Sequence, residues 1–139
     1  MKKSYRGYIF GRPFFGERVP QSVQNLVIRN YCENQKVNFL LSKAEYVIYD
    51  SYSILDYIIG NLKKVDGIVF YSILMLPKNQ LYRKKIYKKI ILNKKKLCFA
   101  LENVSIKNEK DISRIEDIIN TRIVLDYCPK PKELFDFVS

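Results

Sequence analysis

Short apolar runs alternate with longer segments of helical periodicity, and this alternation constrains the fold more than any other feature of the sequence. In each longer segment the apolar residues recur every three or four positions, as in an amphipathic helix. Strands that alternate with helices usually pair in parallel and are covered on both faces. The expected strands are residues 5–10, 37–41, 68–71 and 97–101, and the expected helices are residues 20–34, 51–60, 80–92 and 111–120.

The pattern leaves few topologies, because crossovers between parallel strands are right-handed. We expect an α/β three-layer sandwich with a mostly parallel sheet of four or five strands, in the flavodoxin-like or resolvase-like order 2-1-3-4(-5). Residues 122–125 are a candidate for a short last strand. Pro20 suits the first turn of the first helix, because its missing N–H would be unpaired there. Asp50 or Ser51 can cap the second helix.

Length and composition narrow the class of protein further. The 139 residues fit one domain, residues 1–139, and the tail at 128–139 is expected to be irregular. The basic N-terminus is too polar for a signal peptide, and there is no apolar run of about 18 residues. The three cysteines form no CxxC pair and indicate reduced thiols. We therefore expect a cytoplasmic protein with no metal and no cofactor. The absence of histidine removes the commonest general base and metal ligand.

The formal net charge is +11, and residues 78–96 contain nine lysines and arginines and no acid. Such a segment attracts nucleic acid, anionic lipid or phosphorylated small molecules. The chain is also rich in Lys, Asn, Ile and Tyr, which is typical of an AT-rich genome. Composition is the favoured explanation of the basic face, and a functional role stays open.

Residues 6–24, RGYIFGRPFFGERVPQSVQ, contain the expected first strand, a loop and the start of a helix. In open α/β sheets the crevice at the carboxyl ends of the strands is where ligands bind. Arg12 and Arg18 could hold a phosphate or carboxylate there, since arginine makes bidentate contacts to such groups. Gln21 and Gln24 lie in the first turns of the helix, whose free N–H groups favour anions.

Side chains after later strands would complete this site. Tyr71 ends the third expected strand and Ser72 follows it, and Glu102 follows the fourth. Glu102 or Glu17 would act as the acid or base if a reaction is catalysed, which the sequence leaves open.

Structural roles compete with these assignments. Arg12 and Arg18 could pair with Glu17 and Glu45 to fix the loop, and Glu102 could be the partner of an arginine. Phe14 and Phe15 could cover the core or form the contact of a homo-oligomer.

Three stretches carry a resemblance to a known family: RGYIFGRPFFGERVPQSVQNLVIRNYC, DGIVFYS, and FALENVSI followed by NEKDISRIEDI. Together they resemble the sporadic carbohydrate cluster proteins, small bacterial proteins encoded among genes for surface polysaccharide or lipopolysaccharide synthesis. The resemblance spans residues 5 to about 128. It implies a process, and no reaction or catalytic residue.

A remoter similarity is to the catalytic domain of serine recombinases, which also opens with a strand, an arginine-containing loop and a helix with early glutamines. That family places its nucleophilic serine after the arginine, where this chain has Pro13 and Phe14. The arginines that follow its third strand are replaced here by residues 74–78, LMLPK. The similarity therefore supports the fold, and it puts phosphodiester exchange in doubt.

These observations give three hypotheses for function. The first is a protein of surface-polysaccharide biosynthesis that binds or transforms a phosphorylated or nucleotide-activated sugar. The second is a catalytically degenerate recombinase-like protein that binds nucleic acid through residues 78–96. The third is a dimeric interaction module that uses Phe14 and Phe15.

Overall fold

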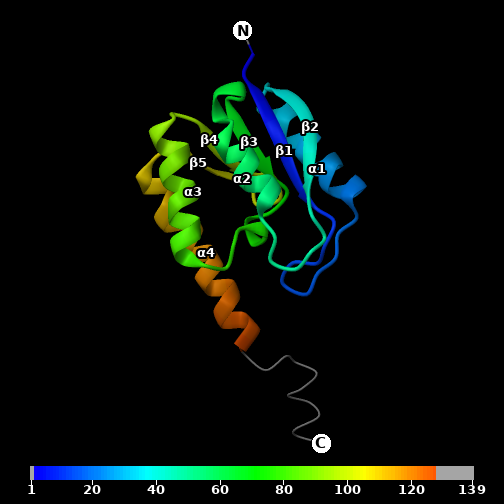
Figure 1. Ribbon diagram of the computed structural model, residues 1–139, viewed down its shortest axis with the longest axis vertical. Helices are drawn as coiled ribbons and strands as arrows, with labels where there is room; N and C mark the ends of the chain where they lie inside the picture. Colours follow the sequence, from blue (N-terminus) through cyan, green and yellow to red (C-terminus); the bar gives the residue numbers. More distant parts are fainter. Residues whose placement is uncertain (1, 128–139) are drawn as a thin grey trace, which may run out of the picture.

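The computed structural model describes residues 2–127, and in that part of the chain five strands form one sheet in the order β2-β1-β3-β4-β5 (Figure 1). The first four strands pair in parallel, and β5 runs antiparallel to β4. This confirms the α/β class, the mostly parallel sheet and the predicted strand order. The strands are β1 (Ser4–Phe10), β2 (Asn38–Glu45), β3 (Gly67–Phe70), β4 (Lys96–Phe99) and β5 (Val104–Ile106).

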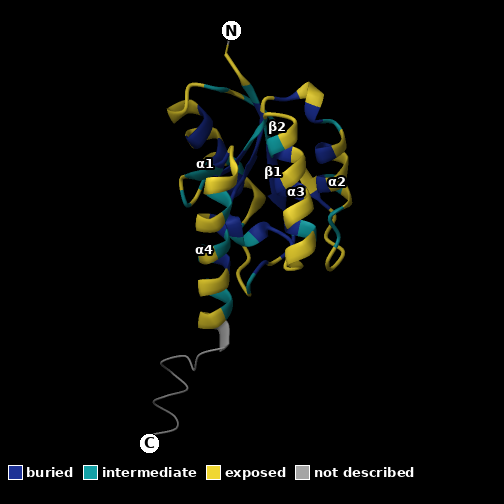
Figure 2. Ribbon diagram, turned by 90° about the vertical axis from the view of Figure 1, so that its left-hand side faces the viewer, coloured by how far each residue is buried: buried dark blue, intermediate teal, exposed yellow. Residues whose placement is uncertain are grey.

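Helices cover both faces of the sheet and give the three layers. Helices α1 and α4 lie on one face, and α2 and α3 lie on the other (Figure 2). The helices are α1 (Gln21–Asn34), α2 (Ser53–Gly60), α3 (Gln80–Leu92) and α4 (Glu109–Tyr127). Short 3₁₀ turns follow α2 and β3, at η1 (Leu62–Lys64) and η2 (Ile73–Met75). None of the helices within residues 2–127 is long and apolar enough to cross a membrane.

The central strand β3 is buried along its whole length, as expected for a continuous apolar run between two helical layers. Aromatic side chains fill the α2–α3 side of the sheet next to it. Phe70 lies between Tyr8 and Phe99, with ring centroids at 4.7 and 5.6 Å. Cys98 on β4 and Cys32 on α1 are both buried. Burying this apolar surface is the main force that holds the layers together.

Two predictions at the C-terminal end of the described residues are wrong. Residues 122–125 belong to helix α4 and not to a strand. Ile115, Ile119 and Ile123 continue one helical spacing, so the helix runs on past residue 120. The fifth strand is instead β5, which returns beside β4 after a tight turn. Residues 128–139, for which an irregular tail was expected, lie outside the described residues.

The start of α2 also differs from the expectation. Tyr52 occupies the cap position, and its own side chain makes no capping hydrogen bond. The carboxylate of Glu45, at the end of β2, accepts the N–H groups of Ile54 and Leu55 at 3.1 Å. A residue eight positions before the helix therefore performs the role predicted for Asp50 or Ser51.

Candidate functional site

The carboxyl ends of β1, β2 and β3 all point to the edge of the sheet opposite the N-terminus (Figure 1). At this edge a groove of about 740 Å³ lies between the segments around α2 and α3. We call it the α2–α3 groove. One wall comes from the end of the β2–α2 loop and the first turn of α2, and the other from the start of α3 and the residues before it. The lining residues are Tyr49, Asp50, Tyr52, Asp56, Pro77, Lys78, Asn79, Leu81, Tyr82 and Lys85.

A smaller hollow of about 80 Å³ continues the groove toward the β1–α1 loop. It shares Tyr49, Asp50, Tyr52 and Lys78 with the groove. Residues 12–15 and Phe10 line its other side. The loop after the first strand therefore does reach a concave surface at the carboxyl edge, as the sequence predicts.

Arg12 is a buried residue whose contacts hold the wall of this hollow in place. Its side chain is 8% exposed, and Nη1 donates to the carbonyls of Tyr46 at 2.9 Å and Ile48 at 3.0 Å. The guanidinium carbon lies 4.3 Å from the centroid of the Phe10 ring and 5.0 Å from that of Tyr52. These contacts fix the β2–α2 loop against β1. A contact between Arg12 and an anion stays a prediction.

Gln24 is fully buried and joins α1 to the end of β1. Its amide oxygen accepts from the N–H of Phe10 at 2.9 Å, and its amide nitrogen donates to the carbonyls of Phe10 at 2.7 Å and Val19 at 2.9 Å. Gln21 is exposed and lies against Gly11, where an added Cβ would come within 2.7 Å of the Gln21 amide nitrogen. Both glutamines thus shape the loop, and neither lines the α2–α3 groove.

Glu17 and Arg18 are exposed on the outer side of the loop. Glu17 lies 3.8 Å from Arg122 of α4, measured from Oε1 to Nη2. It also forms a tight turn with Phe14, whose N–H donates to the Glu17 carbonyl at 2.9 Å. The structure therefore places these two residues away from the α2–α3 groove.

Glu102 and Ser72 form a hydrogen-bonded pair at the ends of β4 and β3. The Ser72 hydroxyl donates to Glu102 Oε2 at 2.7 Å, and the N–H of Ile73 donates to Oε1 at 2.9 Å. Tyr71 is 8% exposed and packs edge-on against Phe14 at 6.2 Å. Burial, together with the charges of Glu102 and Glu17, raises the pKa of Tyr71.

Glu102 lines a different hollow, of about 380 Å³, between the loop after β4, η2 and α4. The eight predicted site residues therefore lie in three separate places. Arg12 lines the hollow beside the α2–α3 groove. Gln24 is buried beneath the β1–α1 loop, and exposed positions in or next to that loop hold Glu17, Arg18 and Gln21. The third place, toward α4, holds Tyr71, Ser72 and Glu102. Their roles toward a ligand stay predictions.

The sequence reasoning missed most residues of the α2–α3 groove. The rings of Tyr52 and Tyr82 pack against each other in a tilted arrangement with centroids 5.9 Å apart, and the Tyr82 hydroxyl donates to Asp56. Burial and then the Asp56 carboxylate raise the pKa of Tyr82, and burial raises that of Tyr52. The sequence signal was the pair of tyrosines in residues 49–52, in the loop between the second strand and the second helix. Lys78 and Lys85 belong to the basic segment for which composition was the favoured explanation.

The groove offers aromatic rings, ammonium groups and carboxylates, which can stack on a ligand, attract its anionic groups and accept hydrogen bonds from its hydroxyls. Within residues 2–127, no group of three or more cysteines, aspartates or glutamates is placed to hold a metal ion.

The fold is similar to that of the N-terminal catalytic domain of TP901-1 integrase, a serine recombinase, with a TM-score of 0.54 and 12% sequence identity. The similarity covers 88% of this chain and 99% of that domain. No protein-family model matches the chain, and no curated protein matches it. The resemblance to the sporadic carbohydrate cluster family is therefore not confirmed, whereas the recombinase-like fold is.

The structure also shows what occupies the loop where the recombinase similarity requires a serine. Phe14 is 7% exposed and packs against Phe10 with centroids at 6.0 Å. Phe15 and Gly16 have φ angles of +49° and +75°, which turn the chain sharply after it. Phe14 in this loop is therefore a side chain of the core. Because Phe14 is buried, Phe15 is the residue of the pair that is left partly exposed, and the homo-oligomer stays a prediction.

Proposed function

We propose that this chain is a binding domain for a phosphorylated or nucleotide-activated sugar, and that the α2–α3 groove holds the ligand. The observation that carries the proposal is the groove itself: three tyrosines, two lysines and two aspartates around about 740 Å³ at the carboxyl edge of a mostly parallel sheet. Ligands of open α/β proteins bind at that edge, and small-molecule sites commonly measure about 300–1,000 Å³.

Each kind of side chain in the groove has a matching part of such a ligand. The ammonium groups of Lys78 and Lys85 attract phosphate. Tyr49 is 87% exposed, so one face of its ring is available to stack on a base or a sugar. Asp50 can accept hydrogen bonds from sugar hydroxyls, as can the Asp56 oxygen that Tyr82 does not use.

Two further parts of the proposal, the biological process and a catalysed reaction, do not follow from the groove. A role in surface-polysaccharide biosynthesis has its support in the sequence resemblance. A reaction with Glu102 or Glu17 as acid or base would need a sugar that extends beyond the groove, because neither residue lines it. Of the residues predicted to bind such a sugar, Arg12 lines the hollow that adjoins the groove. Binding is the part that the groove supports directly.

Nucleic acid is a second candidate ligand. Helix α3 exposes Lys84, Lys85, Lys88 and Lys89 to solvent, and the similar structure is the catalytic domain of an integrase. Contacts from such lysines to phosphates give affinity that falls steeply with salt.

Calorimetry separates the two candidates. The protein is titrated with sugar phosphates, with nucleotide sugars and with a DNA duplex at two salt concentrations. We expect a nucleotide sugar or sugar phosphate to bind, and Tyr49→Ala to weaken a nucleotide ligand by about tenfold through lost stacking.

Lys78→Ala/Lys85→Ala should weaken the same ligand by a similar factor or more. Lys107→Ala/Lys110→Ala removes equal charge from exposed sites outside the groove and should leave binding unchanged. If no sugar ligand binds and DNA does, with a steep salt dependence, the second candidate replaces the first.

A further inference from the structure

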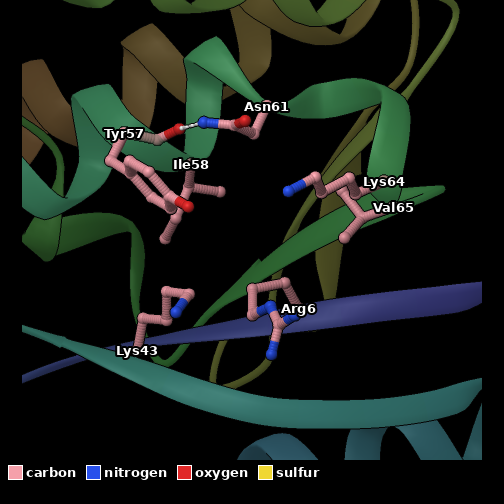
Figure 3. Close-up of a pocket in the computed structure, with 7 residues that line it drawn as sticks. All are labelled: Arg6, Lys43, Tyr57, Ile58, Asn61, Lys64 and Val65. Carbon is pink, nitrogen blue, oxygen red and sulfur yellow. Dashed lines mark hydrogen bonds between the residues drawn. The ribbon is translucent and has the colours of Figure 1, made fainter.

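We propose that a second, smaller pocket on the α2 side of the sheet binds the phosphate group of a small molecule. This basic pocket is lined by Arg6, Lys43, Tyr57, Ile58, Asn61, Lys64 and Val65, and its volume is about 200 Å³ (Figure 3). It is a different site from the α2–α3 groove. The groove uses Tyr52 and Asp56 at the start of α2, whereas the pocket uses the second half of that helix.

Three cations from three elements meet at this pocket. Arg6 comes from β1, Lys43 from β2 and Lys64 from η1, and no aspartate or glutamate lines the pocket. Within residues 2–127, none of the three forms an ion pair with a carboxylate. Like charges that share a hollow repel one another, so a bound anion would stabilise this arrangement.

Two polar groups are directed into the space between the lining residues. They are the ammonium group of Lys64 and the hydroxyl of Tyr57 (Figure 3). Lys43 Nζ lies 5.7 Å from the centroid of the Tyr57 ring, within cation–π range. The ring therefore helps to position that ammonium group.

Two further contacts fix the walls of the pocket. The Arg6 guanidinium donates to the carbonyl of Leu41 at 2.7 Å, and this bond holds its side chain across β1 and β2. Asn61 donates to the carbonyl of Tyr57 at 2.7 Å and holds the last turn of α2. Groups that are already in place lose less conformational freedom when a ligand binds.

The size and charge of the pocket define the class of ligand. A volume of about 200 Å³ is below the range of drug-sized sites, so it fits a phosphate group with few further atoms. The carbonyl groups at the C-terminal end of α2 carry about half a negative charge. That partial negative charge offsets about half of the positive charge of one lysine. The pocket therefore keeps a net positive charge that suits a dianion.

The test follows inorganic phosphate by two-dimensional NMR of the full chain. We expect the backbone signals of Asn61 and Val65 to shift with added phosphate. Lys43→Ala/Lys64→Ala should weaken this binding by about tenfold or more, because two of the three cations are removed. Lys63→Ala/Lys88→Ala removes the same charge from exposed positions that do not line the pocket, and should change the affinity by less than about twofold.

Two further arms separate the sources of the signal. The groove variant Lys78→Ala/Lys85→Ala should leave the Asn61 and Val65 shifts unchanged, which also makes the result independent of the proposed function. Ribose 5-phosphate should bind at least as tightly as inorganic phosphate. The proposal is overturned if phosphate leaves these signals in place, if the control variant loses as much affinity, or if a DNA duplex moves the signals and the small phosphates do not.

Discussion

At the scale of single residues, Glu45 shows how one buried carboxylate can organise both a loop and a helix. It is 3% exposed. Its Oε1 accepts from the Tyr8 hydroxyl at 2.8 Å and the N–H of Leu55 at 3.1 Å, and its Oε2 accepts from the N–H of Tyr46 at 2.9 Å. The negative charge lies at the N-terminal end of α2, where the helix dipole favours it. Burial of Tyr8, together with the charge of Glu45 and the hydrogen bond to it, raises the pKa of the Tyr8 hydroxyl, so that hydroxyl stays a donor.

We predict that Glu45→Gln lowers the free energy of unfolding by about 2 kcal/mol. The amide places an NH₂ group against backbone N–H donors, so at least one of these donors loses its acceptor. Urea denaturation followed by circular dichroism measures the change. Glu33→Gln, at an exposed position of α1, should change stability by less than about 0.5 kcal/mol. Equal losses in the two variants would contradict the role assigned to Glu45.

The sequence identified some of these residues as special without showing what they contact. Arg12 was weighed as a ligand-binding residue and as one that fixes the loop. Its bonds in the structure fix the loop, but through carbonyl groups 34 and 36 positions away and not through a carboxylate. Gln24 likewise contacts residues 14 positions earlier. Contacts of this range depend on the three-dimensional arrangement, which a linear pattern does not record.

At the scale of elements, Arg83 connects two helices and the wall of the groove. Its side chain is 3% exposed, and Nε lies 2.9 Å from Oε2 of Glu116 on α4. Nη1 donates to the carbonyls of Pro77 at 3.0 Å and Lys78 at 2.8 Å. Since Pro77 and Lys78 line the α2–α3 groove, Arg83 sets the position of that wall relative to α4.

We predict that Arg83→Gln lowers the free energy of unfolding by about 3 kcal/mol, because it leaves the Glu116 carboxylate without its cation in a largely buried place. Arg114→Gln, at an exposed position of α4, is the matched control and should cost less than about 0.5 kcal/mol. Chemical denaturation of both variants gives the comparison. A cost for Arg83→Gln no larger than that of the control would show that the ion pair does not connect the helices.

The elements that could be predicted from the sequence are those with a long and regular pattern. Helix α3 has the predicted bounds, 80–92, since its apolar residues keep one spacing and residue 79 caps it. Strand β5 was missed because three residues are too few for an alternating pattern to show, and it exists only by pairing with β4. The predicted last strand was wrong. The β-branched residues at 123 and 124 favour a strand locally, whereas the position of Ile123 on the apolar face of α4 favours the helix.

At the scale of the whole molecule, positive charge dominates the surface. Within residues 2–127, ion pairs join Arg83 to Glu116 and Arg122 to Glu17. The formal net charge of +11 means that lysines and arginines outnumber the acidic residues. The excess cations create an electrostatic field that attracts anions over much of the surface. This field would attract the ligands of both the α2–α3 groove and the basic pocket. The shape and lining of each cavity would make its binding specific.

On the α1 side of the sheet, two buried thiols and a buried tyrosine hydroxyl stay protonated in the folded protein. These groups lose their protons when the protein unfolds at high pH. Burial raises the pKa of Cys32 and of Cys98 to about 11, and that of Tyr5 to about 12. In the unfolded chain these groups titrate near 9 for the thiols and near 10 for the tyrosine. The folded state therefore holds more protons than the unfolded state between about pH 9 and pH 11.

The sign of the effect follows from linkage. Where the folded state binds more protons, the free energy of unfolding falls as pH rises, by about 1.4 kcal/mol per pH unit for each fully ionising group. The stability from the neutral thiols is therefore complete below about pH 9 and is lost as pH approaches 11. Other ionisable groups of the chain also contribute to this slope, so the slope must be compared between variants.

We predict that Cys32→Ala/Cys98→Ala makes the loss of stability between pH 9 and pH 11 shallower, by about 1 kcal/mol per pH unit or more. Urea denaturation at a series of pH values measures the slope, with Cys128→Ser in every variant so that the thiol in the tail does not contribute. The small cavities that alanine leaves lower stability by the same amount at every pH, and they do not change the slope. If the slopes are equal, the two thiols do not remain protonated in the folded protein, and the alkaline loss must come from other groups.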